Sequence, residues 1–346
     1  MMRFAPIVVA LVAGSGAGRA EWKRLPSLSD KEGFATPFAG VSNGALLVAG
    51  GANFPDKKPW FGGKKVWYDG VFVLEKADGE WKNAGKLPRA LAYGVSVTHR
   101  DGVVCAGGSD ATQHYADCFR LEWKAGKLVT TQLPALPKPV ANACGALVGD
   151  TLYVAGGQEK PDSKEALQAV YTLDLGDAKA KWREEEKMPG AGRILAAGAS
   201  FEGKFWIAGG AELVADKDGN VARRYLKDAA FHEPTKGWGR CLPLPHAVVG
   251  APSPAPSDKT GFYILGGDDG SQLIVPFNRH KGFSKKVLRF DAKTRDWVEA
   301  GELSAPRVTV PLVVWDGAWV IPSGEMRPGV RSPEVWREES TVKGKR

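Results

Sequence analysis

The hydrophobic pattern of the chain is dominated by a short apolar run that ends in a glycine doublet. Leu46-Leu47-Val48-Ala49 leads into Gly50-Gly51, and the arrangement returns at intervals of roughly 50 to 58 residues. Short apolar runs bounded by turn-forming residues are typical of buried strands. The five complete copies occupy residues 46–51, 103–108, 152–157, 205–210 and 262–267, and a degenerate copy occupies residues 319–324. This periodicity predicts a repeat architecture built from six similar units.

Each doublet is followed by a second apolar segment and then by a tryptophan. Residues 71–74 precede Trp81, for example, and residues 287–290 precede Trp297. A Leu-Pro or Met-Pro turn follows most of these tryptophans, and a strand of small residues, such as 93–97, begins the next unit. Four short strands per unit result. We expect the first strand to line a crowded axis and the tryptophan of the fourth strand to fill the gap between neighbouring sheets.

The two ends of the chain complement each other. Residues 22–26, Trp-Lys-Arg-Leu-Pro, have the pattern of a fourth strand, whereas the last unit, residues 308–335, contains three strands. The N-terminal strand should therefore complete the last unit and leave no open sheet edge. The doublet-plus-tryptophan pattern resembles the kelch family of β-propellers. The prediction is an all-β, six-bladed kelch propeller, a single domain over residues 21–346 with a tail from about residue 339.

The N-terminus has the features of a secretory signal peptide. Arg3 precedes an apolar core at 5–13, and small residues lead to a small-x-small cleavage site at 18–20. The apolar core is too short to span a bilayer, so we expect no membrane span. The prediction is removal of residues 1–20, a mature chain that begins near Glu21, and a periplasmic or secreted location.

Composition and charge limit the classes of molecule that the protein is expected to bind. The 346 residues are 43% hydrophobic and 25% charged, which is ordinary for a soluble globular protein. The net charge is +8, yet lysine and arginine are scattered and no basic stretch alternates with aromatic residues. This distribution favours an anionic small molecule and argues against nucleic acid.

Four cysteines are too few for a disulfide scaffold. Cys105 and Cys118 lie on successive predicted strands and could pair in an oxidising compartment. Free buried thiols at all four positions, Cys144 and Cys241 included, are an equally good interpretation.

The candidate chemistry lies in residues 322–331, Pro-Ser-Gly-Glu-Met-Arg-Pro-Gly-Val-Arg. A strand leads into Glu325, and the Pro-Gly turn that follows could fold this carboxylate against Arg331, with Arg327 nearby. A carboxylate among guanidinium groups is either a structural ion pair or part of a site for an anionic ligand. The segment alone leaves both interpretations open.

Three segments resemble the bacterial sialic acid mutarotases (N-acetylneuraminate epimerases). They are Phe38-Ala39-Gly40-Val41-Ser42-Asn43 with the following 48–54, Arg89-Ala90-Leu91-Ala92-Tyr93-Gly94-Val95-Ser96, and Gly324-Glu325-x-x-Pro328-Gly329-x-Arg331. The resemblance implies that Glu325 and Arg331 form the catalytic pair. It also implies a circularly permuted order, because the glutamate motif precedes the Phe-Ala-Gly segment in enterobacterial members and follows it here.

The segments after each doublet should meet on one rim, because strand-two-to-three connections and blade-to-blade connections emerge on the same face. Glu325 would then remove the anomeric hydroxyl proton, and Arg331 with Arg327 would bind the sugar carboxylate or stabilise negative charge. Further candidates for substrate binding are Arg89, Arg193 and Arg307, which precede first strands, and Asn53, which lies on a rim loop.

Competing functions are weighed by the residues that they require. A sialidase needs a Tyr-Glu pair and Ser-x-Asp-x-Gly-x-x-Trp turns, which this sequence does not show. A radical copper enzyme needs two histidines and two tyrosines on the metal, and tyrosine is scarce on the rim loops. We therefore expect neither metal nor cofactor. A non-catalytic kelch module that binds a glycan or a protein stays open, because propellers host unrelated functions. The oligomeric state is not predicted.

Overall fold

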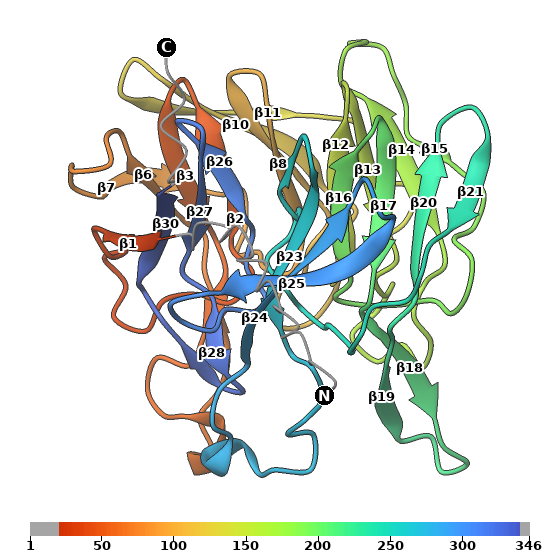
Figure 1. Cartoon of the computed structure of the whole chain (residues 1–346). Helices are drawn as coiled ribbons and strands as arrows, with labels where there is room; N and C mark the ends of the chain where they lie inside the picture. Colours follow the sequence, from red (N-terminus) through yellow and green to blue (C-terminus); the bar gives the residue numbers. More distant parts are fainter. Residues whose placement is uncertain (1–20, 340–346) are drawn as a thin grey trace, which may run out of the picture.

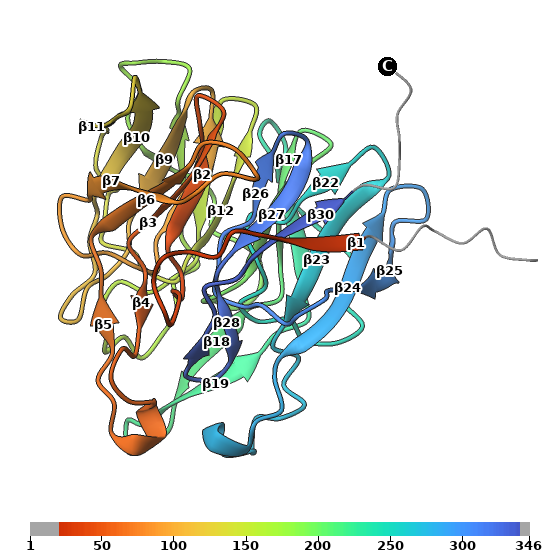
Figure 2. The ribbon, with the colours of Figure 1, turned by 90° about the vertical axis from the view of Figure 1, so that its left-hand side faces the viewer.

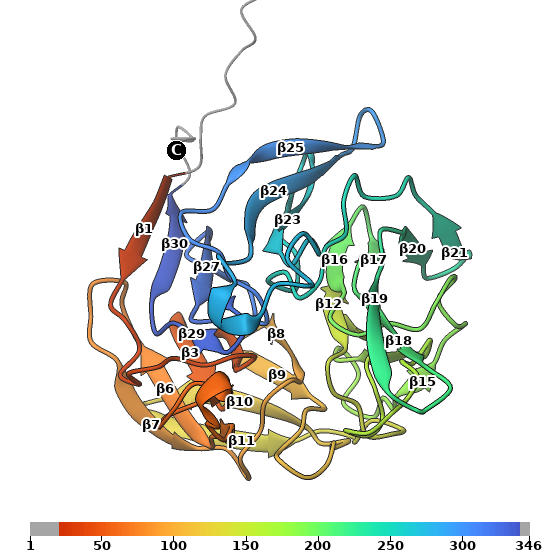
Figure 3. The same cartoon turned by 90° about the horizontal axis from the view of Figure 1, so that it is seen from below.

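Six four-stranded antiparallel sheets surround a central axis in residues 21–339, which are the residues that the computed structural model describes (Figures 1 and 3). Blade 1 contains β2 (Phe38–Ser42), β3 (Ala45–Ala49), β6 (Gly70–Leu74) and β7 (Lys82–Lys86). Blade 2 contains β8 (Val95–His99), β9 (Gly102–Ala106), β10 (Cys118–Lys124) and β11 (Lys127–Gln132). Blade 3 contains β12 (Cys144–Val148), β13 (Thr151–Ala155), β14 (Val170–Asp174) and β15 (Arg183–Glu184).

The second half of the ring repeats this order. Blade 4 contains β16 (Ala197–Phe201), β17 (Lys204–Ala208), β20 (Ala229–Glu233) and β21 (Gly237–Arg240). Blade 5 contains β22 (Ser257–Asp258), β23 (Gly261–Gly267), β24 (Ser284–Asp291) and β25 (Asp296–Glu302). Blade 6 contains β26 (Val313–Trp315), β27 (Ala318–Pro322), β30 (Val335–Glu339) and β1 (Glu21–Leu25).

The chain termini close the ring as predicted. Strand β1 pairs antiparallel with β30, so that Leu25 lies opposite Val335, and the two strands run side by side in Figure 2. Trp22 packs against Leu265 and Ile321 between blades 5 and 6. The predicted six-bladed propeller is therefore confirmed, including the blade that is shared between the two ends of the chain.

Tryptophans also join neighbouring blades, as the sequence pattern predicts. The indole nitrogen of Trp81 donates a hydrogen bond to the carbonyl of Pro26 at 2.7 Å, and that of Trp297 donates to Leu242 at 2.9 Å. Trp123 differs from the prediction, because it lies on the third strand β10 and donates to the Glu75 carboxylate at 3.0 Å. Trp123 and, on the fourth strand, Leu128 both pack against the core cluster shared by blades 1 and 2.

All four cysteines are free thiols, and a Cys105–Cys118 disulfide is not formed. Cys118 lies opposite Ala106, one residue out of register with Cys105. Successive residues of a strand face opposite sides of the sheet, so the two sulfurs enter different core clusters. Burial raises the pKa of the Cys118 thiol to about 12.

A closed ring of backbone hydrogen bonds surrounds the axis, at the point where each blade begins. Six residues each donate an N–H to the carbonyl of the preceding member, at distances of 2.6 to 3.1 Å, and the sixth bond closes the circle. The members are Thr36, Tyr93, Asn142, Leu195, Gly250 and Thr309. All six have positive φ angles, between 46° and 68°, and the closed ring maintains the strain that this conformation imposes on the members other than Gly250.

The remaining elements project from one face, at the bottom of Figures 1 and 2. They connect second strands to third strands, whereas the tight hairpins lie on the opposite face. They are β4 (Ala52–Asn53), η1 (Pro59–Phe61), β5 (Val66–Trp67), β18 (Ala211–Ala215), β19 (Val221–Tyr225), η2 (Phe277–Arg279), β28 (Glu325–Arg327) and β29 (Val330–Arg331). We call this the rim face.

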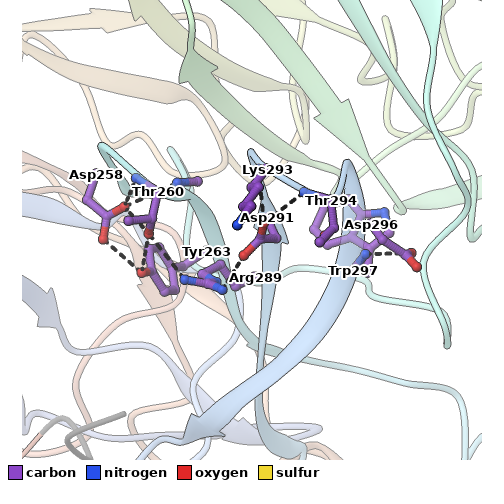
Figure 4. A network of polar contacts seen from close by, with 10 residues as sticks. Asp258, Thr260, Tyr263, Arg289, Asp291, Lys293, Thr294, Asp296 and Trp297 are labelled. Atoms are coloured by element: carbon purple, nitrogen blue, oxygen red, sulfur yellow. Dashed lines mark hydrogen bonds and ion pairs between the residues drawn. The ribbon is translucent and has the colours of Figure 1, made fainter. Parts of the chain in front are cut away.

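Figure 4 shows a network of polar contacts around the β22–β23 and β24–β25 turns of blade 5, on the opposite face. Asp258 accepts hydrogen bonds from the hydroxyl groups of Thr260 and Tyr263 at 2.7 and 2.8 Å. Asp291 accepts from the backbone N–H groups of Lys293 and Thr294. These carboxylates satisfy donors of tight turns and have a structural role.

Candidate functional site

A cavity of about 340 Å³ opens on the rim face directly above the axial ring, within the usual size of ligand sites. Its floor is formed by ring members that include Tyr93, Asn142 and Thr309. Rim loops of several blades supply its walls. The charged and phenolic side chains among the lining residues are Lys65, Tyr93, Arg223, Tyr225, Asp268, Glu325 and Arg331.

Glu325 lies at the inner edge of this cavity because it follows the sixth doublet-like turn directly. The hairpin of β28 and β29 places it opposite Arg331, as predicted. Its Oε1 accepts the Gly329 N–H at 2.7 Å and lies 3.2 Å from the Arg331 Nη1. Its Oε2 accepts from the Thr309 hydroxyl at 3.4 Å, and 13% of the side chain is exposed. The carboxylate is held in place yet still borders the cavity.

Arg331 is almost fully buried beside Glu325, with 4% of its side chain exposed. Its guanidinium stacks on the Phe54 ring at 4.7 Å. Nε and Nη1 lack an aligned hydrogen-bond acceptor among the described residues, so the Nη1–Glu325 contact is an ion pair without good hydrogen-bond geometry. The arginine offsets the negative charge of Glu325 and has little surface left for a ligand.

Arg327 and Asn53 make contacts within the rim loops and are not among the cavity-lining residues. Arg327 lies over the Trp60 ring at 5.3 Å and donates to the carbonyls of Asn278 and His280. Asn53 is fully buried: it donates to the carbonyl of Gly33 and to Asp30, and it accepts from the Tyr68 hydroxyl at 2.8 Å. These contacts favour structural roles for both residues.

The three arginines that precede first strands do not face the cavity. Arg193, 2% exposed, forms a bidentate ion pair with Asp228 at 2.6 and 3.1 Å. Arg307, 1% exposed, pairs with Glu334 at 2.7 Å. Arg89 pairs with Asp117 and stacks on Tyr115. The expectation that these arginines converge on the funnel is corrected by the structure, because carboxylates elsewhere in the propeller bind them.

The role of Asn53 can be separated from a role in ligand binding. Asn53→Ala is expected to lower the free energy of unfolding by about 1–3 kcal/mol, because it leaves the Gly33 carbonyl and the Tyr68 hydroxyl without their partner. Urea titration measures this change. Ligand affinity should stay unchanged in the folded variant, and a selective loss of affinity at unchanged stability would restore Asn53 to the binding site.

Sequence reasoning missed Lys65, Tyr93, Arg223 and Tyr225 as cavity residues. Two signals could have found them. Tyr93 precedes a first strand at the axial ring, and the others lie on rim loops that follow doublets. Asp268 accepts the Gly270 N–H at 3.0 Å and also accepts from the Tyr225 hydroxyl at 2.7 Å. Burial and the neighbouring Asp268 raise the pKa of Tyr225.

A second cavity of about 400 Å³ adjoins the first on the rim face. Four residues line both cavities: Lys65, Tyr93, Asn142 and Arg223. Its outer wall includes Asp110 and His114, which come from the connection between β9 and β10. Burial lowers the pKa of His114, which favours a neutral imidazole at pH 7.

Asp110 predicts a pH dependence of stability. Burial raises its pKa, but hydrogen bonds from Tyr115, Thr112 and Gln113 outweigh that effect and lower the pKa from 3.8 to about 2. Because the folded-state pKa lies below the unfolded one, this stabilisation is present above pH 4 and is lost as the pH falls toward 2. Asp110→Asn should therefore lower the melting temperature at pH 7, with a difference from wild type that shrinks between about pH 4 and 2. A difference that is independent of pH would contradict this assignment.

The residues that the structure describes contain no group of three or more His, Cys, Asp or Glu side chains placed to hold a metal ion. They also contain no helix with the length and apolarity needed to cross a bilayer.

The fold and the site together define a six-bladed β-propeller with a carboxylate–guanidinium pair at an axial cavity. Comparison with known proteins narrows this class. A family model described as N-acetylneuraminate epimerase matches residues 10–130, a segment that precedes the Glu325 hairpin. The chain is thus similar to the family that its sequence motifs indicate.

Curated relatives agree with this similarity. The N-acetylneuraminate epimerase of Haemophilus influenzae (strain 86-028NP) is 28% identical over 238 residues, which are 61% of this chain and 60% of the relative. The N-acetylneuraminate epimerase of Yersinia enterocolitica serotype O:8 / biotype 1B (strain NCTC 13174 / 8081) is 40% identical over 125 residues, 31% of each chain. The first of these matches therefore spans less than two thirds of the relative's length.

The solved structure of YjhT superposes on this chain with a TM-score of 0.65 at 16% identity. The superposition covers 92% of this chain and 98% of YjhT. At this identity the likeness shows the shared fold of the two proteins.

Proposed function

We propose that this protein is a sugar mutarotase that accelerates the interconversion of N-acetylneuraminate anomers. The single observation that carries the proposal is the placement of Glu325: its carboxylate borders an axial cavity, fixed by the Gly329 N–H and paired with Arg331. The relatives' names and the positive net charge support an anionic sugar as substrate.

Glu325 acts as the general base of the proposed reaction. The carboxylate takes the proton of the anomeric hydroxyl, the anomeric oxygen forms a carbonyl, and the bond between the anomeric carbon and the ring oxygen breaks. The ring oxygen then receives a proton from the carboxylic acid of Glu325. Rotation about the bond to the planar carbonyl carbon allows closure on the other face, which yields the other anomer. Atoms and protons balance without a metal or a redox cofactor.

In this scheme Arg331 positions the carboxylate of Glu325 and offsets its negative charge. Its Nη1 lies 3.2 Å from Oε1 of Glu325 and offsets the negative charge of the carboxylate without an aligned hydrogen bond. The Gly329 N–H fixes the hairpin turn on which both residues depend.

Anomer equilibration followed by NMR tests the function. A freshly dissolved single anomer of N-acetylneuraminate should equilibrate faster with catalytic amounts of protein than without it, and a neutral sugar such as glucose should respond less. Saturable binding of N-acetylneuraminate with an unchanged rate would instead identify a non-catalytic binding module.

We also propose export of the chain to the periplasm or beyond. The proposal depends on the signal-peptide pattern of residues 1–20, which lie outside the described residues. Mass spectrometry of the cell-associated and exported protein tests it: a mature N-terminus near Glu21 supports export, and an intact Met1 in the cytoplasm contradicts it.

A further inference from the structure

Three lysine or arginine side chains line the axial cavity among residues 21–339: Lys65, Arg223 and Arg331. They differ in how far protein carboxylates already neutralise them. Arg331 is buried against Glu325 and under Phe54, so a ligand carboxylate could reach it only by competing with Glu325. Lys65 and Arg223 have no such ion pair with a described carboxylate.

Lys65 has an aromatic environment and no counter-charge. Its ammonium lies 5.9 Å from the Phe54 ring, 5.4 Å from the Trp67 ring and 5.2 Å from the Tyr93 ring. Within the described part of the chain, no carboxylate lies within ion-pair distance of it. Aromatic faces attract a cation but supply no counter-charge, so the Lys65 ammonium has no competing carboxylate when an anion enters the cavity.

Arg223 lines the same two cavities as Lys65, but it comes from blade 4, whereas Lys65 comes from blade 1. It lies on β19 in the rim hairpin of blade 4 and is exposed, whereas its neighbour Arg224 is bound by Glu212. No described carboxylate pairs with Arg223. Lys65 and Arg223 both line the boundary between the two cavities, above the floor residues Tyr93 and Asn142.

This boundary lies above the first residues of blades 2 and 3, whereas Glu325 belongs to blade 6, which lies across the ring from blade 3 (Figure 3). The carboxylate and the anomeric hydroxyl of N-acetylneuraminate share one carbon atom. If Arg331 held the substrate carboxylate, two carboxylates would meet at one guanidinium, and their repulsion would oppose binding. Lys65 on the rim loop of blade 1 and Arg223 on the rim loop of blade 4 avoid this repulsion, because neither of them is paired with Glu325.

We propose that Lys65 and Arg223 form the subsite that binds the carboxylate of the substrate, and that Arg331 acts only through Glu325. The inference deepens the proposed mutarotase function and depends on it for the identity of the ligand. It makes Lys65 the residue that selects anionic 2-keto sugars over neutral ones.

The test compares N-acetylneuraminate with its methyl ester, which keeps the anomeric hydroxyl and lacks the charge. Lys65→Met should weaken binding of the acid about 10- to 100-fold by calorimetry, as expected for losing a hydrogen bond to a charged group. Binding of the ester should change by about twofold or less. Lys65→Arg should recover most of the affinity for the acid, and Arg223→Met should act in the same direction as Lys65→Met.

Lys64→Met is the matched control, because Lys64 is exposed and lines neither cavity. It should bind both ligands like wild type. Wild-type affinity of Lys65→Met for the acid, or an equal loss for acid and ester, would overturn the subsite. So would a wild-type protein that does not bind N-acetylneuraminate.

The same samples separate this inference from the proposed function. Lys65-dependent binding of the acid without faster anomer exchange supports the subsite and refutes the mutarotase. Faster exchange with KM unchanged in Lys65→Met supports the mutarotase and refutes the subsite.

Discussion

Replacing Glu325 with glutamine is expected to slow protein-catalysed anomer exchange about 100- to 10,000-fold at pH 7, the usual contribution of a general base. The amide has the shape of the carboxylate but cannot accept the anomeric proton. Its oxygen can still accept the Gly329 N–H, so the hairpin should keep its conformation. Exchange NMR at equilibrium measures the rate directly.

Two further variants make this result specific. Glu325→Asp keeps a base of similar strength about one methylene farther away, so it should retain more activity than Glu325→Gln. Glu184→Gln, which alters an exposed carboxylate on β15, should exchange anomers like wild type. A Glu325→Gln rate equal to that of wild type would remove Glu325 from the mechanism.

The largest expected loss of stability follows from Glu334→Ala. This change should lower the free energy of unfolding by about 3–5 kcal/mol, because it leaves the buried charge of Arg307 without its partner. Burial already lowers the pKa of Arg307, although the hydrogen bond and the charge of Glu334 act to raise it. Glu334 also accepts a hydrogen bond from the Trp336 indole at 3.2 Å. Denaturant unfolding measures the loss.

Glu339→Ala provides the matched comparison at the end of the same segment, on β30. Glu339 pairs with Lys23, but both side chains are about half exposed, and exposed ion pairs contribute little. The loss of stability should be much smaller than in Glu334→Ala. Equal effects of the two substitutions would show that the Arg307 pair is not the structural contact described above.

The architecture follows from sequence because its determinants are local and repeated. Gly50-Gly51 recurs where the backbone adopts positive φ and approaches Leu91 of the next blade too closely for a side chain. The Trp22 strand lacks partners in its own unit, which indicates the closure with β30. The pairing of Glu325 with Arg331 follows from the Pro-Gly turn between them.

Which side chains line the cavity cannot be predicted from any one segment of the sequence. Sequence alone suggests that Arg193 and Arg307 face the funnel, because each precedes a first strand. Leu91 and Val140 occupy the equivalent position in blades 2 and 3 and are buried, which marks this position as part of the core. Superposing the repeats, rather than considering each arginine alone, would have shown this. Lys65 and Arg223 lie on long rim loops that share no pattern between blades, so their approach to one boundary requires the three-dimensional structure.

A crystal structure of Glu325→Gln with N-acetylneuraminate would show directly whether residue 325 faces the reacting atoms. The sugar is expected on the axial floor, with its anomeric oxygen about 2.6–3.2 Å from the side chain of residue 325, the reach required of a general base. The sugar carboxylate should face Lys65 and Arg223. A sugar bound elsewhere, or one with its anomeric centre turned away from residue 325, would contradict the account.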